Sequence, residues 1–318
     1  MVFQAVQSVL SLLILIAIGF FVTKKPWFGK AGSDLFSKFT VKVAIPVYMT
    51  YNVITTCETK DKLFELSRSL PIPFATILLS LLLGLLLARV FKVEQKRRGV
   101  FINAVTFSNT VIIGFPVISS LFGDEATPDG MIYYMANTIL FWTIGVYLLR
   151  RDSGENVKLV SWEGVKKIFS PPIIGFLIGM VIVLLNIELP EFIFTPLEML
   201  KQTTTPMAMI FIGSIISNAD FKSMKLTKDL ALILVVRFIV SPIFMAMLCM
   251  LLPIDQMMKQ VFFVLATMPA MTQLGIMSKE SDSDYEFASV VVAVTTTVSM
   301  VAIPIYMYII SAFQLFLI

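Results

Sequence analysis

Ten predominantly apolar segments of 16 to 27 residues follow one another along this chain of 318 residues, with charged or turn-rich breaks between them. About 20 consecutive apolar residues span the hydrocarbon of a bilayer as an α-helix. Only 14% of the residues are charged, against about a quarter in soluble domains. The sequence therefore predicts an all-α polytopic membrane protein surrounded by lipid. The expected helices are residues 4–23, 36–56, 70–91, 100–122, 130–149, 171–186, 194–217, 229–252, 258–277 and 286–312.

Lys and Arg residues are distributed unevenly between alternate loops. One set of loops holds 18 of them and the other set holds 4. Short cytoplasmic loops retain basic residues, so the basic set, which includes the loop at 150–169, is expected in the cytoplasm. Both termini then lie outside a plasma (inner) membrane. The N-terminal residues show no signal-peptide pattern, and the first segment is expected to stay in place as a helix.

Histidine is absent from the sequence. Imidazole metal sites and histidine-based acid–base catalysis are therefore excluded. An intramembrane aspartyl enzyme would need two carboxylates inside helices, and every Asp falls in an expected loop or helix end. We expect no enzyme activity, metal, cofactor or nucleic-acid partner. Cys57 and Cys249 lie near different helix ends and are expected to be unpaired.

The two halves of the chain resemble each other at a nearly constant offset. Pairs of glycines and prolines in the first two segments of each half lie 160 residues apart, namely Gly19 with Gly179 and Pro46 with Pro206. At an offset of 161, VFINAVTFSNTVIIG (100–114) aligns with VFFVLATMPAMTQLG (261–275). The offset then changes, so Pro116 either pairs with Pro269 or has no partner.

This offset predicts two five-helix repeats, residues 1–150 and 170–318, joined by a cytoplasmic loop at 151–169. Because five is an odd number, the second repeat must be inverted in the membrane relative to the first. Alternating-access carriers are commonly built in this way.

The fourth expected helix is too polar to face lipid. Ser108, Asn109 and Thr110 lie inside the span and are followed by Gly114 and Pro116. Pro116 removes a backbone donor and clashes with the preceding turn, and Gly114 eases unwinding, so a break is expected at these residues. Backbone groups freed at membrane depth are tolerated only where protein or a water-filled cavity satisfies them.

The ninth expected helix repeats this arrangement. Its residues that we expect at a binding site are Met268, Pro269, Ala270, Thr272 and Gln273. If the two breaks cross at mid-membrane, half-helix N-termini, each worth about half a positive charge, point at one place. A carboxylate would fit there, with Asn109 as a neutral donor. The alternative is that the prolines and polar side chains only pack helices together.

Three basic residues lie inside expected helices and are not counted with the loops: Lys42, Lys201 and Arg237. Lys201 has Glu198 three residues earlier on the same face, which predicts an intrahelical ion pair. Lys42 and Arg237 lie close enough to helix ends for their side chains to snorkel to the membrane surface. Of these two, Arg237 is the better candidate for substrate contact, because a guanidinium can hold a second carboxylate bidentately.

The segment FSNTVIIGFPVISSLFGDEA (107–126), with Pro46, Pro206, Arg237 and MPAM (268–271), resembles the auxin efflux carrier family. This family contains bacterial malate and malonate permeases and the plant PIN-FORMED auxin exporters, and the likeness covers nearly the whole chain. It implies the ten-helix inverted-repeat fold of bile-acid sodium symporters, related to sodium/proton antiporters. It also implies a scaffold of segments 1, 2, 6 and 7, a mobile transport domain of segments 3–5 and 8–10, and a homodimer through the scaffold.

The resemblance further implies that substrate binds where segments 4 and 9 cross, with Asn109 as the substrate-contacting asparagine. Bile-acid relatives bind sodium partly through an acidic residue in the ninth helix, and the stretch ATMPAMTQ (266–273) has none. Oxygens of Ser108, Asn109 and Gln273 are the remaining candidate ligands, and a site without a carboxylate is a poor one. A proton or the membrane potential is therefore expected to drive transport in preference to sodium.

Together these features predict an elevator-type secondary transporter for a small mono- or dicarboxylate. One alternative is a membrane sensor that binds a metabolite without moving it. Another is a cation/proton antiporter on the same fold, which would need an acidic residue inside the transport domain. The sequence leaves open which anion is carried, in which direction and with which ion.

Overall fold

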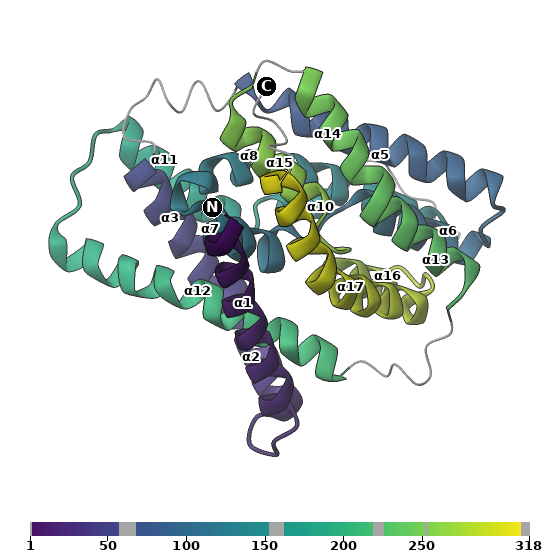
Figure 1. Cartoon of the computed structure of the whole chain (residues 1–318), viewed down its shortest axis with the longest axis horizontal. Coiled ribbons are helices and arrows are strands. Elements are labelled where there is room, and N and C mark those ends of the chain that lie inside the picture. The colour runs from purple at the N-terminus through teal and green to yellow at the C-terminus, as the bar shows by residue number, and fades with distance from the viewer. Residues whose placement is uncertain (1, 57–67, 153–161, 219–225, 252–253, 313–318) are drawn as a thin grey trace.

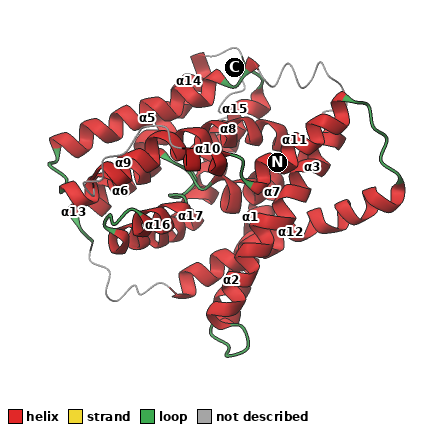
Figure 2. Cartoon of the chain, turned by 180° about the vertical axis from the view of Figure 1, so that it is seen from behind, coloured by secondary structure: helices red, strands yellow, loops and turns green. Residues whose placement is uncertain are grey.

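The computed structural model describes residues 2–56, 68–152, 162–218, 226–251 and 254–312. Within these residues the chain is helical and has no β-strand (Figure 1, Figure 2), and every expected apolar segment coincides with helix. The elements are α1 (Val2–Thr23), α2 (Gly29–Phe39), η1 (Thr40–Ala44), α3 (Ile45–Thr56), α5 (Pro71–Val90), α6 (Gln95–Thr106), η2 (Thr110–Gly114), α7 (Phe115–Phe122), η3 (Asp124–Ala126), α8 (Thr127–Leu140), η4 (Phe141–Gly145), α9 (Val146–Asp152), α10 (Trp162–Ile168), α11 (Pro171–Leu184), α12 (Glu191–Asn218), α13 (Lys228–Val235), η5 (Val236–Val240), α14 (Ser241–Leu251), α15 (Gln256–Ala266), α16 (Gln273–Glu280) and α17 (Tyr285–Ala312).

Several expected segments differ from the structure in extent. The second begins earlier than residue 36, because α2, η1 and α3 follow one another without a gap from Gly29. Gly29 has a φ of +47°, a backbone conformation that glycine adopts without a steric penalty at this turn. The fourth and ninth segments are each two helices separated by non-helical residues. The expected loop at 150–169 also contains helix α10 in its described part.

One group of helices consists of α1, α3, α11 and α12, on the left and at the bottom of Figure 1. Glycines allow its backbones to approach closely. A Cβ atom on Gly19 of α1 would clash with the backbone of Ile210 in α12, and one on Gly175 of α11 would clash with the backbone of Pro46 in α3. Small residues at such crossings are typical of helix packing in membranes.

Helix α2 and segment η1 contact this first group. A second group has α5, α6, α13, α14, α16 and α17 on the right of Figure 1 and α7, α8 and α15 near the centre. Its core contains Phe101, Phe107, Phe115, Phe141 and Phe262, none of which is exposed. The rings of Phe107 and Phe141 pack edge to face with centroids 5.5 Å apart, a favourable aromatic geometry. The gap residues 107–109 and 267–271 are themselves buried in the protein.

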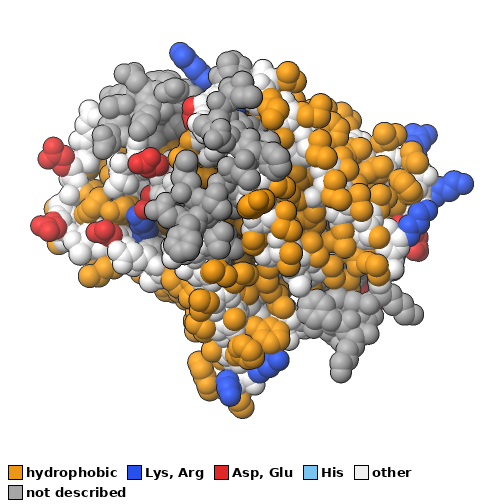
Figure 3. All heavy atoms as spheres, in the orientation of Figure 1, with side chains coloured by type: hydrophobic (Ala, Val, Ile, Leu, Met, Phe, Trp, Pro, Cys, Tyr) orange, Lys and Arg blue, Asp and Glu red, His pale blue; other side chains and the backbone are white. Residues whose placement is uncertain are grey.

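Hydrophobic side chains cover a broad area of the face in Figure 3, from the lower middle to the right of centre. The charged side chains visible on this face lie mostly on its left and right sides and at its lower end. Phe21, Leu82 and Val301 are all at least 60% exposed. Among the described residues, four helices are long and apolar enough to cross a membrane unaided: Pro71–Val90, Asp124–Asp152, Lys228–Leu251 and Tyr285–Ile310. An apolar surface of this extent is expected to contact lipid.

Candidate functional site

The two broken helices cross at a short antiparallel bridge between Ser108 and Ala270. The first gap spans residues 107–109, between α6 and η2, and the second spans 267–272, between α15 and α16. Two helices therefore end at the crossing and two begin there. The structure thus brings the predicted polar stretches of segments 4 and 9 together.

The break in the fourth segment lies before Gly114 and Pro116, so the prediction that it falls at these residues is wrong. Pro116 lies inside the continuous helical run Thr110–Phe122, directly after the π-helical turn η2, so it does not end the helix. Gly114 packs closely against α15, because a Cβ there would lie 2.6 Å from the Leu265 side chain, which would have to shift. Pro269 does lie inside its gap, and its carbonyl accepts a hydrogen bond from the Asn109 backbone N–H at 2.8 Å.

The side chain of Asn109 links the two gaps. Its Oδ1 accepts a hydrogen bond from the Ile112 backbone N–H at 3.3 Å and so caps the resumed helix. Its Nδ2 donates to Thr272 Oγ1 at 2.8 Å, which uses one of two amide hydrogens. Thr110 and Gln273 are the first residues of η2 and α16. Asn109 and Thr272 therefore lie where the two resumed helices start.

Arg237 lies beneath this crossing, in segment η5. Its side chain is only 1% exposed, so the expectation that it snorkels to the membrane surface is wrong. All five N–H donors of the guanidinium are used. The acceptors are the carbonyls of Met268 (2.7 Å), Pro269 (3.1 Å), Ala104 (2.6 Å) and Val105 (3.2 Å) and the hydroxyl of Ser108 (2.8 Å). No carboxylate among the described residues pairs with it, and contact between Arg237 and a substrate stays a prediction.

Sequence reasoning missed two residues that hold the extended backbone of the gaps. Asn137 of α8 pairs with Ser108 as a strand would, accepting from its N–H at 3.1 Å and donating to its carbonyl at 3.0 Å. Thr295 of α17 accepts from the Ala270 N–H at 3.2 Å. Both are fully buried inside long apolar helices. A polar residue in such a position was the signal that could have identified Asn137.

Comparison with known proteins places this arrangement in a family. The model of the family described as "Membrane transport protein" matches residues 4–307. The chain belongs to this family. This confirms the resemblance to the auxin efflux carriers. One relative is an uncharacterized transporter of Methanothermobacter thermautotrophicus, which is 24% identical over 94% of this chain and 96% of its own length. Another is an uncharacterized transporter of Methanocaldococcus jannaschii, which is 23% identical over 94% of this chain and 96% of its own length. Family membership makes transport, and not catalysis, the activity class.

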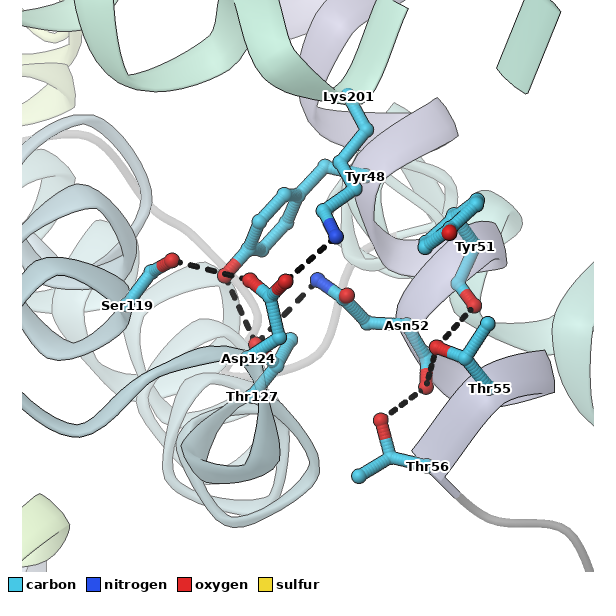
Figure 4. Close-up of polar contacts among 9 residues, drawn as sticks. All are labelled: Tyr48, Tyr51, Asn52, Thr55, Thr56, Ser119, Asp124, Thr127 and Lys201. Carbon is cyan, nitrogen blue, oxygen red and sulfur yellow. Dashed lines mark hydrogen bonds and ion pairs between the residues drawn. The ribbon is translucent and has the colours of Figure 1, made fainter. Parts of the chain in front are cut away.

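A second polar cluster of the transporter joins the two helix groups (Figure 4). Lys201 of α12 forms an ion pair of 2.5 Å with Asp124 of η3. Tyr48 of α3 shares a hydrogen bond of 2.8 Å with Thr127 of α8, and Asn52 donates to the same hydroxyl at 3.3 Å. The distribution of basic residues between the loops predicts that these ends of α3, α8 and α12 lie on the outer side of the membrane. Each contact joins the α1–α3–α11–α12 group to the other group.

The structure also tests the predictions for Lys201 and Lys42, the two lysines inside expected helices that are not counted with the loops. The predicted ion pair between Lys201 and Glu198 is wrong, because Lys201 contacts Asp124 instead. The Lys201 ammonium also lies 4.3 Å from the centroid of the Tyr51 ring. Lys42 is exposed, as expected for a residue near a helix end. Of the predicted cysteines, Cys249 is buried and free, and Cys57 lies outside the described residues.

Proposed function

We propose that this transporter carries a small organic anion, such as a mono- or dicarboxylate, across the plasma membrane, and that the anion binds at the crossing. The observation that supports this most directly is that two helix N-termini, those of η2–α7 and α16, meet beside the Asn109 amide. Each N-terminus is worth about half a positive charge. Arg237 lies beneath the crossing as a buried cation that binds backbone carbonyls and has no carboxylate partner among the described residues. This electrostatic environment favours a carboxylate over a cation.

An inverted repeat is part of the proposal, and equivalent contacts support it. Ser108 and Ala270 form the bridge at nearly the same offset as the sequence repeat. Asn137 and Thr295, from equivalent segments of the two halves, each hold one of these residues by its backbone. Alternating-access carriers with such repeats bind substrate near the bilayer midplane, at broken helices.

Elevator movement is supported by the separation into two helix groups. We assign α1, α2, η1, α3, α11 and α12 to the scaffold and the other elements to the transport domain. Between them lies an apolar cavity of about 30 Å³, lined by Leu13, Ile16 and Met209 on one side and Ile113 and Val117 on the other. Apolar contacts can slide without losing directional bonds. A homodimer through the lipid-facing side of the scaffold belongs to the same proposal.

The polar cluster in Figure 4 acts as a latch in this scheme. The Lys201–Asp124 ion pair and the Tyr48–Thr127 hydrogen bond join scaffold to transport domain at their outer ends. Sliding of the transport domain requires both contacts to break. The latch therefore stabilises the conformation of this structure relative to the conformation that the protein adopts after the transport domain has moved.

The proposed orientation, with both termini outside, is supported by an ion-pair cluster at the opposite end of the bundle. Arg97 of α6 pairs with Asp284 at 2.9 Å and with Asp229 at 3.4 Å, next to the starts of α17 and α13. All three residues flank loops that the distribution of basic residues places in the cytoplasm. A proton as the coupling ion stays a prediction, because no described carboxylate contacts the crossing.

Flux into proteoliposomes tests this function. Purified protein would be reconstituted, and uptake of radiolabelled malate, malonate, succinate, lactate and indole-3-acetate would be measured against protein-free vesicles. The proposal predicts saturable uptake of at least one acid and its exchange with unlabelled acid inside. Binding of an acid without any flux would contradict transport and would favour a sensor.

A further inference from the structure

Arg237 lies where the first halves of both broken helices end. Ala104 and Val105 belong to the last turns of α6, and Met268 and Pro269 follow the end of α15. The four carbonyls of these residues converge on one guanidinium that comes from a third segment, η5. Carbonyls at a helix C-terminus have no partner inside their own helix. Arg237 supplies that partner for both helices at once.

The charges at this point balance. A helix C-terminus is equivalent to about half a negative charge, so the ends of α6 and α15 together offset about one positive charge. A buried charge is unfavourable unless it is compensated, and the two C-termini together with five hydrogen bonds compensate the guanidinium. This explains how Arg237 can be 1% exposed without forming an ion pair among the described residues.

The same ligand set is the one that a monovalent metal ion would use. In carriers with broken helices, unwound carbonyls and half-helix C-terminal ends coordinate the coupling cation. Here four such carbonyls and the Ser108 hydroxyl already donate their lone pairs to Arg237 at 2.6 to 3.2 Å. A sodium ion does not fit at this position while the guanidinium is there.

We propose that Arg237 is a tethered substitute for the co-transported cation, so that the anion binds and moves without sodium or any other monovalent metal ion. The inference rests on the proposed function and specifies its ion requirement. Arg237 acts as a positioning residue in this proposal, because its five donors bind acceptors of the protein and so set the charge and the backbone geometry of the crossing.

The balance of charge also limits the substrate. Once Arg237 is offset by the two C-termini, the N-termini of η2–α7 and α16 leave about one positive charge. That charge matches a single carboxylate beside Asn109. A second carboxylate of a diacid would therefore lie outside the crossing, where water or the scaffold can solvate it. The substrate class is thus any small acid with one carboxylate free to enter.

Chemical rescue tests whether the cation itself is required. In Arg237→Ala, the vacated space and the five acceptors should accept free guanidinium, so guanidinium chloride at millimolar concentration should raise the melting temperature. Choline chloride at equal concentration controls for ionic strength. Arg97→Ala is the matched control, because Arg97 is partly exposed and pairs with two carboxylates. Guanidinium should not rescue that variant, nor should it raise the melting temperature of the parent protein.

The ion dependence of anion binding gives the second readout. In the parent protein, the affinity for the transported acid should be the same in sodium and in choline buffers. In Arg237→Ala, the two helix C-termini lose the positive charge that offsets them. Affinity for the anion should therefore fall by about tenfold or more, and sodium or guanidinium should restore part of it. Arg237→Lys retains the charge but not the planar five-donor geometry, and should keep more affinity than the alanine variant.

Several outcomes would overturn the inference. A parent protein that loses flux when choline replaces sodium would do so, as would an alanine variant that guanidinium neither stabilises nor restores. If Arg237→Ala does not fold, the comparison of sodium with choline in the parent protein and in Arg237→Lys still decides. The absence of flux with every acid would contradict the proposed function instead, while rescue of the melting temperature would still report on Arg237 alone.

Discussion

Replacing Asn109 should separate anion recognition from folding. Asn109→Ala removes the Nδ2 donor at the start of both resumed helices. A hydrogen bond to a charged group contributes about 1.5 to 3 kcal/mol, and each 1.4 kcal/mol is tenfold, so the dissociation constant of the anion should rise about 10- to 100-fold. Loss of the cap to Ile112 should cost about 1 kcal/mol of stability, which lowers the melting temperature by only a few degrees.

The assay is equilibrium binding of the radiolabelled acid to protein in detergent, together with a melting curve for each variant. Asn109→Asp keeps the side-chain shape but replaces the donor by a negative charge, so it should bind even more weakly than alanine. Thr297→Ala is the control, because its hydroxyl bonds only to Ala293 within α17. Affinities of both Asn109 variants within twofold of the parent protein would refute the reasoning.

Three further predictions follow from contacts away from Asn109. Asn137→Ala leaves the Ser108 N–H without its partner and removes one of the two hydrogen bonds to the Ser108 carbonyl, which also accepts from the Thr110 N–H. It should destabilise the protein by about 1 to 3 kcal/mol, measured as a lower melting temperature that does not depend on ligand. Gly213→Val should push α1 away from α12 and lower the melting temperature strongly. In Gly275→Ala the new Cβ would meet only one side-chain atom, at 3.9 Å, so this variant should have an unchanged or higher melting temperature. Equal effects of the two variants on the melting temperature would contradict this account. A double-mutant cycle of Lys201→Met and Asp124→Asn should give a coupling of about 1 kcal/mol in the free energy of unfolding, and a coupling of zero would contradict the proposed latch.

The sequence predicts where the helices are but not where the fourth segment breaks. Apolar segments are visible because lipid requires them, and they all coincide with helix. Proline disfavours helix interiors, so the sequence predicts the break at Pro116, yet the helix η2–α7 runs through this residue after a π-helical turn. The real gap at 107–109 is stabilised by distant partners, including Asn137 and Arg237. Such partners depend on which helices meet, and periodicity does not contain that information.

The ion pair of Lys201 likewise shows that contacts between residues close in sequence can be predicted, whereas contacts between distant helices cannot. Glu198 lies three residues before Lys201, and helical spacing favours that pair. The observed partner, Asp124, belongs to another helix group and is far away in the sequence. For the candidate site, polar residues inside two apolar spans predict that segments 4 and 9 meet, and Ser108 and Ala270 of these segments do pair in the structure. It could not show that all five donors of Arg237 are already used.

The most direct test of the central claim is an experimental structure of the transporter with the best-binding acid present. The account predicts density for a carboxylate within hydrogen-bonding distance of Asn109 Nδ2, facing the first turns of η2 and α16, with Arg237 still bound to the carbonyls beneath. Density for the acid at a site away from the crossing, or a sodium ion in place of the Arg237 guanidinium, would contradict it.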